Sequence, residues 1–353
     1  MSVSFLIFRL YNVADEIDLA KGEQLLADGK SVSRLRLKRV SPKSISFKNP
    51  PVNAELEGCR LELGGRPFHA KAGARLYDYG IVTITLSLDI QAETYGEVLE
   101  LGYAINESNL DNIFLDYLRT TLAAIQPALV GAKKPAFEEE DLIVYYFRKW
   151  EKGWDPVPLL LAEKDPVSEE MRRETLKNRF SYAEDFAILT WDSAIVYDPT
   201  SSPDIPDLLE FANAQLLKLR YYDHVLDREI EEMYDAIEDA DRGGRLRRLG
   251  NYRRIMRRLL ELVADITEIT ERIRNSLKVT EDVFYARVYT SALNILRVRE
   301  WADSITQKVQ VIERSYSMLS EEIVTYRSTA LEVAIVLLIA LEIVLFALVE
   351  LRP

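Results

Sequence analysis

The sequence predicts an α+β N-terminal domain, followed by long antiparallel helices of the coiled-coil type and a C-terminal transmembrane helix. Three observations lead to this prediction. Strand-length runs rich in β-branched and aromatic residues are interrupted by helical patterns up to residue 198. Apolar residues then recur at alternating three- and four-residue spacings. The chain closes on the apolar run "ALEVAIVLLIALEIVLFALVELRP".

Composition narrows the classes of function. The 353 residues are 48 % hydrophobic and 29 % charged, with a net charge of −12, which is typical of a folded protein with room for two domains. The acidic balance argues against binding nucleic acid over a broad surface. The single cysteine, Cys59, excludes an intramolecular disulfide and a Cys-rich zinc site. We predict no metal, no cofactor and no catalytic residue.

The α+β domain is predicted over residues 1–198. Strands are expected at 2–10, 75–90 and 141–150, and a hairpin at 186–198 that turns at Asp192 and Ser193. Helical spacing covers residues 94–125, and a serine cap followed by acidic residues opens a helix at 168–178. The Pro- and Ser-rich residues 199–207 are predicted to be a linker.

A helical hairpin and a long rod helix are predicted over residues 208–329. Glycines near residue 243 and at residue 250 supply the reversal between the first two helices. Asp223 is the one charged residue at a core position of the heptads in the first helix. It is predicted to be a buried contact that sets the register, or a partner for an arginine of another helix. A catalytic pair with His224 is disfavoured because adjacent helical side chains point about 100° apart.

Residues 330–353 are predicted to span a membrane as the single anchor of a tail-anchored protein. Leu331 to Leu351 would be ~31 Å long as a helix, which matches the ~30 Å hydrocarbon core. Glu342 lies in the middle and is a candidate polar residue for assembly within the membrane. In the alternative interpretation, this run is a helix in the core of a soluble bundle, and its acidic residues form the solvent-exposed side of that helix.

Basic residues indicate the orientation of the predicted span. Lys308, Arg314 and Arg327 precede it and only Arg352 follows, which favours a cytoplasmic location for the bulk of the chain.

A cluster of arginines stands out in this acidic chain, in "DRGGRLRRLGNYRRIMRR". Phosphate is the ligand that arginine clusters favour, so RNA, a ribosome or anionic lipid is a candidate partner here. In the alternative interpretation, the acidic residues directly upstream, in "DREIEEMYDAIEDAD", neutralise the cluster across the hairpin. The arginines are Arg242, Arg245, Arg247, Arg248, Arg253, Arg254, Arg257 and Arg258.

Several stretches together resemble a known family. "RLYDYGIVTITLSL" resembles a strand of the family required for meiotic nuclear division. "DLLEFANAQLLKLRYYDHVLD", "LRVREWADSITQKVQVIERSYSMLSEE" and the closing apolar helix resemble its helical half. The resemblance implies a membrane-anchored, oligomeric protein without known catalytic residues. In mitochondrial members it also implies support of translation at a membrane.

The predicted function is that of a membrane-tethered scaffold or partner-binding protein. It is expected to be non-catalytic and to form a homo-oligomer through its long heptad helices, and the sequence does not identify a protein partner. Two alternatives stay open. One is an enzyme of unrecognised type in the α+β domain, and the other is a wholly soluble helical bundle that binds other proteins.

Overall fold

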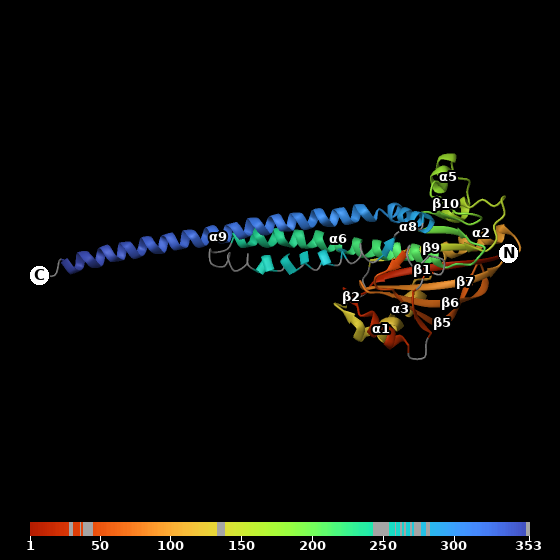
Figure 1. The fold of residues 1–353 in the computed structure, drawn as a ribbon, viewed down its shortest axis with the longest axis horizontal. Helices are drawn as coiled ribbons and strands as arrows, with labels where there is room; N and C mark the ends of the chain where they lie inside the picture. The colour runs from red at the N-terminus through yellow and green to blue at the C-terminus, as the bar shows by residue number, and fades with distance from the viewer. Residues whose placement is uncertain are drawn as a thin grey trace. The chain divides into compact units, whose positions relative to one another are not determined.

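The computed structural model divides the chain into two compact units. It describes residues 1–27, 31–35, 37, 45–132, 138–242, 254–257, 259–261, 263–264, 266–268, 270–271, 277–279 and 283–350. Unit 1 comprises residues 1–221 and 269–302, and unit 2 comprises residues 222–268 and 303–353. Figure 1 labels many of the elements along the chain.

Unit 1 is built on a nine-stranded mixed sheet with the order β10-β11-β12-β9-β1-β7-β6-β5-β3. Adjacent strands run antiparallel, except for β9 and β12, which are parallel. The first strand of the chain therefore lies in the interior of the sheet, between β7 and β9. The strands are β1 (Ser2–Asn12), β3 (Val32–Arg34), β5 (Val52–Leu63), β6 (Arg66–Tyr77), β7 (Ile81–Gln91), β9 (Glu139–Phe147), β10 (Arg179–Ser181), β11 (Phe186–Leu189) and β12 (Ser193–Tyr197).

Two short pairs of strands form small sheets of their own. β2 (Glu16–Ile17) pairs with β8 (Leu129–Val130), and β4 (Ile45–Phe47) pairs with β13 (Leu277–Val279).

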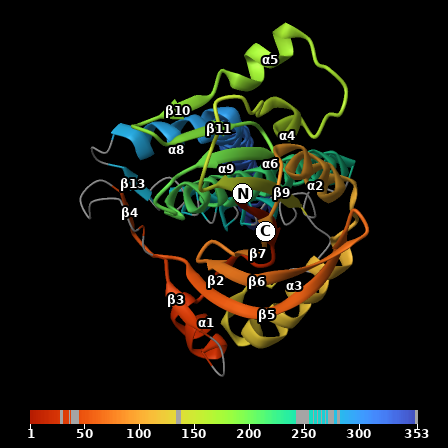
Figure 2. The same cartoon turned by 90° about the vertical axis from the view of Figure 1, so that its right-hand side faces the viewer.

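Helices cover one face of the strands β5, β6 and β7, as Figure 2 shows. They are α1 (Leu19–Leu26), α2 (Tyr95–Glu107) and α3 (Asp111–Ile125), the last continued by the short helix η1 (Gln126–Ala128). Their apolar sides and the strands share one core, in which Phe5 and Phe114 are fully buried. Two more helices, α4 (Val157–Leu161) and α5 (Glu169–Leu176), contact β12 and β11 respectively.

The start of α6 (Asp204–Arg242) packs on the opposite side of β6. The ring centroid of Phe211 lies 5.8 Å from that of Tyr77 on β6 and 6.2 Å from that of Tyr289 on α8 (Val283–Ile295). Residues 205–219 of α6 are buried at every position. A helix buried on all sides in this way lies between two layers, here the sheet and α8.

Unit 2 consists of helical segments. They are the later part of α6, the described residues between 254 and 268, and α9 (Val298–Glu350) from residue 303 onward. Ile305, Ile312 and Leu319 of α9 are buried and lie seven residues apart. Leu319 packs against Ile237 of α6 and against two apolar residues of the intervening segment, Ile255 and Met256.

The architecture confirms the coarse prediction of an α+β region with a large sheet, followed by helices. The hairpin at 186–198 is confirmed as β11 and β12, and the helix at 168–178 as α5, where Ser168 Oγ accepts a hydrogen bond from the Met171 N–H at 3.2 Å. The strand predicted at 75–90 is instead two strands joined by a turn, and the helix at 94–125 is two helices. Residues 204–207 of the predicted linker are the first turn of α6.

The predicted transmembrane helix at 330–353 is wrong. Nowhere in the described ranges does the chain form a helix with both the length and the apolar character needed to cross a bilayer. The part of α9 that was predicted to span carries two carboxylates, Glu332 and Glu342, and a charged side chain is costly in a hydrocarbon core. Three further predictions depended on this span and are wrong as well: a membrane as partner, a tail anchor, and a membrane location with the bulk of the chain in the cytoplasm.

Candidate functional site

Most of the predicted arginine cluster lies outside the described residues, namely Arg245, Arg247, Arg248, Arg253 and Arg258. Arg242 is the last residue of α6. Arg254 and Arg257 lie on the helical segment of unit 2, and both are exposed. Contact between this cluster and phosphate stays a prediction.

Asp223 lies buried in unit 2, where it joins α6 to α9. Its carboxylate accepts a hydrogen bond from Ser304 Oγ at 2.6 Å and pairs with Lys308 Nζ at 2.8 Å. Lys308 Nζ also pairs with Asp227 at 2.6 Å. Burial lowers the pKa of Lys308, but the hydrogen bonds to the two aspartates outweigh it and raise that pKa above its ordinary value. The basic partner of Asp223 is thus a lysine rather than an arginine. The role of Asp223 in setting the register of the helices stays a prediction.

Glu342 is exposed, and so is every residue from Leu331 to Ile343. It lies on α9 among aliphatic side chains that each leave more than half of their surface open. This apolar stretch, residues 331–343, is the largest run of exposed aliphatic residues among those that the structure describes.

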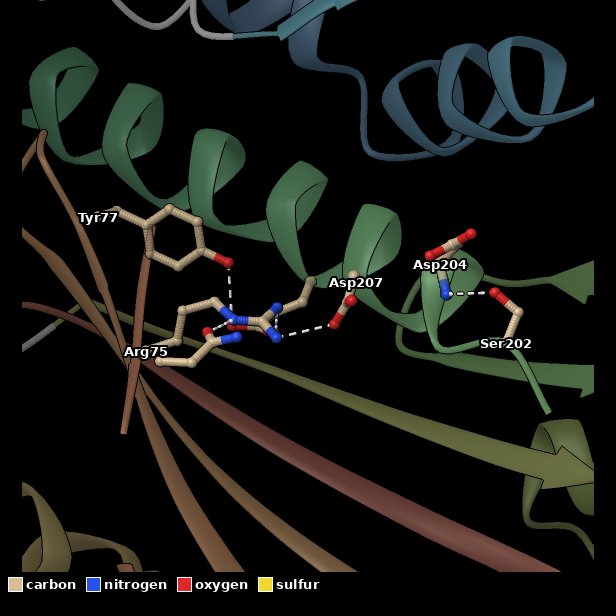
Figure 3. Close-up of polar contacts among 7 residues, drawn as sticks. Arg75, Tyr77, Ser202, Asp204 and Asp207 are labelled. Carbon is tan, nitrogen blue, oxygen red and sulfur yellow. Dashed lines mark hydrogen bonds and ion pairs between the residues drawn. The ribbon is translucent and has the colours of Figure 1, made fainter. Parts of the chain in front are cut away.

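A cluster of buried charges that the sequence did not reveal lies between β6 and α6, as Figure 3 shows. Arg75 and Tyr77 alternate along β6 and therefore point to the same face of the sheet. Asp207 and Glu210 lie three residues apart on α6 and share one face of that helix. The acids of the first turns also complement the positive end of the helix dipole, and Asp204 N–H donates to Ser202 Oγ at 3.3 Å.

The Arg75 guanidinium is held by three acceptors. Nη2 pairs with Asp207 Oδ1 at 2.8 Å, Nη1 pairs with Glu210 Oε2, and Nε donates to Asn53 Oδ1 at 2.5 Å. Tyr77 donates its hydroxyl to the other oxygen of Glu210, at 2.9 Å. The side chain of Glu210 is 1 % exposed and that of Arg75 is 13 % exposed, so water screens this pair weakly.

Burial dominates the electrostatics of this cluster. It raises the pKa of Glu210, and Arg75 opposes that rise only in part. Burial lowers the pKa of Arg75, but Glu210 and Asp207 outweigh it and raise that pKa well above its ordinary value, so Arg75 stays charged. With its donors engaged by three side chains, the guanidinium ties a strand to a helix.

A buried lysine provides a second tie for α6. Lys218 is fully buried, and its ammonium donates to Asn12 Oδ1 at 3.0 Å and to the Ala14 carbonyl at 2.8 Å, at the end of β1 and just after it. A buried ammonium needs such acceptors to offset its lost hydration. Arg75 and Lys218 therefore anchor α6 to the sheet at two points.

Metal-binding chemistry has no support in the described part of the chain. No group of three or more His, Cys, Asp or Glu side chains is arranged there to hold an ion. The charge clusters around Arg75 and around Asp223 each pair one cation with two carboxylates through short ion pairs.

Comparisons with known proteins place the chain in a family. The family model described as "Uncharacterized protein MJ0711, N-terminal domain" matches residues 2–204, which is more than half of the chain. A similar protein is "Uncharacterized protein MJ0711" of Methanocaldococcus jannaschii (strain ATCC 43067 / DSM 2661 / JAL-1 / JCM 10045 / NBRC 100440), 28% identical over 189 residues. The match covers 53% of this chain and 57% of that protein, so it spans little more than half of the relative's length. No solved structure matches.

The comparisons overturn the resemblance to the family required for meiotic nuclear division, to which nothing links this chain. That resemblance was carried by a turn-containing strand and by apolar helical spacing, and both patterns recur in unrelated folds because they report secondary structure rather than ancestry. With more than half of its length matched by the family model, the chain belongs to the family described as Uncharacterized protein MJ0711, N-terminal domain.

Proposed function

We propose that this protein is a non-catalytic scaffold whose long helices assemble copies of the chain, with the apolar stretch of α9 as the contact. The observation that carries the proposal is the exposure of that stretch. Its large aliphatic residues each leave 52–65 % of their surface open: Leu331, Val333, Ile335, Val336, Leu337, Leu338, Ile339, Leu341 and Ile343.

The area suits a stable interface. Nine aliphatic side chains exposed to this degree offer on the order of 800 Å² around the helix, which is comparable with what one protein buries in an interface of standard size. Contiguous apolar patches of more than a few hundred Å² mark interaction sites on soluble chains. A second copy brings the same apolar area, so both surfaces leave water together.

The heptad seam of unit 2 continues into the apolar stretch. Buried Ile305, Ile312 and Leu319 recur every seven residues, two further heptads along α9 lead to Val333, and a third leads to an alanine at position 340, with Leu337 in the seam between them. A seam that already packs against helices within one chain is thereby extended toward helices of another copy. Glu332 and Glu342 lie about 80–180° away from this seam at 100° per residue, so a paired helix leaves both carboxylates facing outward.

The mass of the full-length protein in solution tests the proposal. Light scattering coupled to gel filtration is expected to give at least two copies. Leu337→Asp, in the seam, is expected to lower the mass to that of one chain, because it places a charge in the interface. Val324→Asp is the matched control, since Val324 lies on the same helix, is 63 % exposed and lies outside the apolar stretch. A native protein that stays a single chain at high micromolar concentration would overturn the proposal.

A further inference from the structure

A pocket of about 350 Å³ opens on the α6 face of the sheet in unit 1, beside the buried charges of β6 and α6. Its volume lies within the range of ~300–1,000 Å³ that small-molecule sites occupy. Residues in register on neighbouring strands form its floor. Asn53 of β5 lies opposite Ser33 of β3, and Gly73 of β6 lies opposite both Glu55 of β5 and Thr85 of β7. All five line the pocket.

Gly73 leaves this floor open. It lies in the interior of β6, and its φ is not positive, so the backbone there suits an ordinary residue. Among the described residues, a Cβ on Gly73 would touch only the Ala54 carbonyl oxygen, at 3.6 Å, which is an ordinary van der Waals distance. Glycine weakens the interior of a strand, and it often marks a place where a ligand approaches the backbone closely. The packing of the chain does not require Gly73, whereas an occupant of the pocket does.

Polar groups with hydrogen-bonding capacity to spare surround the floor. Within the part of the chain that the structure describes, the hydroxyls of Ser31, Ser33 and Thr85 make no hydrogen bond. Asn53 Oδ1 accepts from Arg75 Nε at 2.5 Å, which leaves its amide NH₂ group as a donor. The two serines are exposed and the other two side chains are half-buried, so a ligand can reach all four. Because hydroxyls both donate and accept, this lining suits a ligand whose own groups do both.

The charges at the pocket favour a neutral ligand. Arg75 is the one basic residue among the described residues of the lining, and Asp207 pairs with it at 2.8 Å (Figure 3). The charge of Arg75 is therefore already compensated. An incoming anion would meet the carboxylates of Asp207 and of Glu55, which is exposed, and like charges brought together in this way weaken binding.

We infer that this pocket binds a neutral monosaccharide. The hydroxyls of the sugar would exchange hydrogen bonds with Ser33, Asn53 and Thr85, and one of its ring faces would lie over Gly73. Leu6 and Pro203, both half-buried in the lining, offer apolar surface to the C–H groups of the ring. The inference concerns unit 1 and is independent of assembly through α9.

Titration of neutral sugars into the full-length protein, followed by calorimetry, tests the inference. D-glucose, D-galactose and D-mannose are the probes, and at least one is expected to bind saturably. Tetrahydropyran has the same ring without hydroxyls and is expected not to bind, because it cannot engage the polar lining. The uronate of the sugar that binds best adds a carboxylate to that sugar, and it is expected to bind about tenfold more weakly.

Gly73→Val fills the pocket from its floor and separates binding from folding. Because the Cβ has room and valine favours strands, the melting temperature is expected to stay at or above the native value. Binding of the sugar is expected to be lost, and Gly73→Ala, which fills less of the space, is expected to weaken it in part.

Thr85→Val keeps the shape of the side chain and removes its hydroxyl, so the affinity for the sugar is expected to fall about fivefold. Ser87→Ala is the matched control, since Ser87 lies two residues along β7 on the same face of the sheet and outside the pocket lining. No saturation by any of the three sugars, tighter binding of the uronate, or native affinity in both Gly73→Val and Thr85→Val would overturn the inference.

Discussion

Arg75 shows what a single residue contributes when its charge is buried. Removing one partner of a buried ion pair leaves the other charge without compensation, which is more costly than never having had the pair. Here Glu210 would remain at 1 % exposure without a cation, with the Tyr77 hydroxyl as a donor to its second oxygen. The residue therefore stabilises the contact between β6 and α6 because its partners cannot be hydrated.

We expect Arg75→Met to lower the free energy of unfolding of unit 1 by about 3–5 kcal/mol. Adding Glu210→Gln in the same chain should recover part of that loss, because the second change removes the stranded charge. Urea unfolding followed by tryptophan fluorescence checks this, since all four tryptophans, at positions 150, 154, 191 and 301, lie in unit 1.

Lys71→Met serves as the control for that experiment. Lys71 lies on the same strand and pairs with Asp89 at 2.8 Å, but it is 74 % exposed, and exposed pairs contribute little. A loss of stability equal to that of Arg75→Met would contradict the account given for the buried pair.

At the scale of elements, the turn between β6 and β7 decides the register of the sheet. Gly80 has a φ of +82°, and its carbonyl accepts hydrogen bonds from the Val13 and Ala14 N–H groups at 3.0 and 3.3 Å. A Cβ at this position would lie 2.0 Å from the Ala14 carbonyl oxygen. Only glycine combines this backbone conformation with so close an approach.

Gly80→Ala is therefore expected to destabilise unit 1 by about 1–3 kcal/mol, from backbone strain and from the displaced segment after β1. Thermal unfolding followed by circular dichroism measures the loss. In Gly153→Ala, where nothing lies within 4 Å of the added methyl group, the melting temperature should stay within error of the native value.

The same turn shows where sequence reasoning succeeds and fails. The richness in β-branched and aromatic residues predicted strands around positions 2–10 and 141–150, where most side chains of β1 and β9 are buried. It joined residues 75–90 into one strand, since the pattern continues through a turn of only three residues. The pairing of Arg75 with acids 132 and 135 residues away left no local signal, because an arginine in a strand resembles any solvent-facing residue.

At the scale of the whole molecule, two aspartates each add a small contribution to stability that depends on pH. Asp89 accepts hydrogen bonds from Lys71, which is the larger cause, and from Ser4, and both lower its pKa. Burial raises the pKa of Asp155, but two hydrogen bonds from Arg172 at 2.7 and 3.1 Å lower it below the ordinary 3.8. A carboxyl whose pKa is lowered by folding stabilises the native state above pH 3.8 and loses that contribution as pH falls through its native pKa.

The double variant Asp89→Asn, Asp155→Asn is thus expected to melt below the native protein at pH 6 and together with it at pH 2. Scanning calorimetry at the two pH values tests the convergence. Asp116→Asn, at a carboxylate that is 75 % exposed, should show no difference at either pH. A gap between native and double variant that persists at pH 2 would mean that the aspartates act through packing instead.

The position of β1 within the sheet also bears on how the chain folds as it is made. Its apolar residues are synthesised before both of its neighbours, since β7 ends at residue 91 and β9 at residue 147. Because synthesis proceeds at about 5–20 residues per second, β9 becomes available to pair with β1 on the order of ten seconds after β1 has been made. A chaperone that shields extended apolar segments during translation therefore has a defined target here, and strand β1 is where premature association between nascent chains would begin.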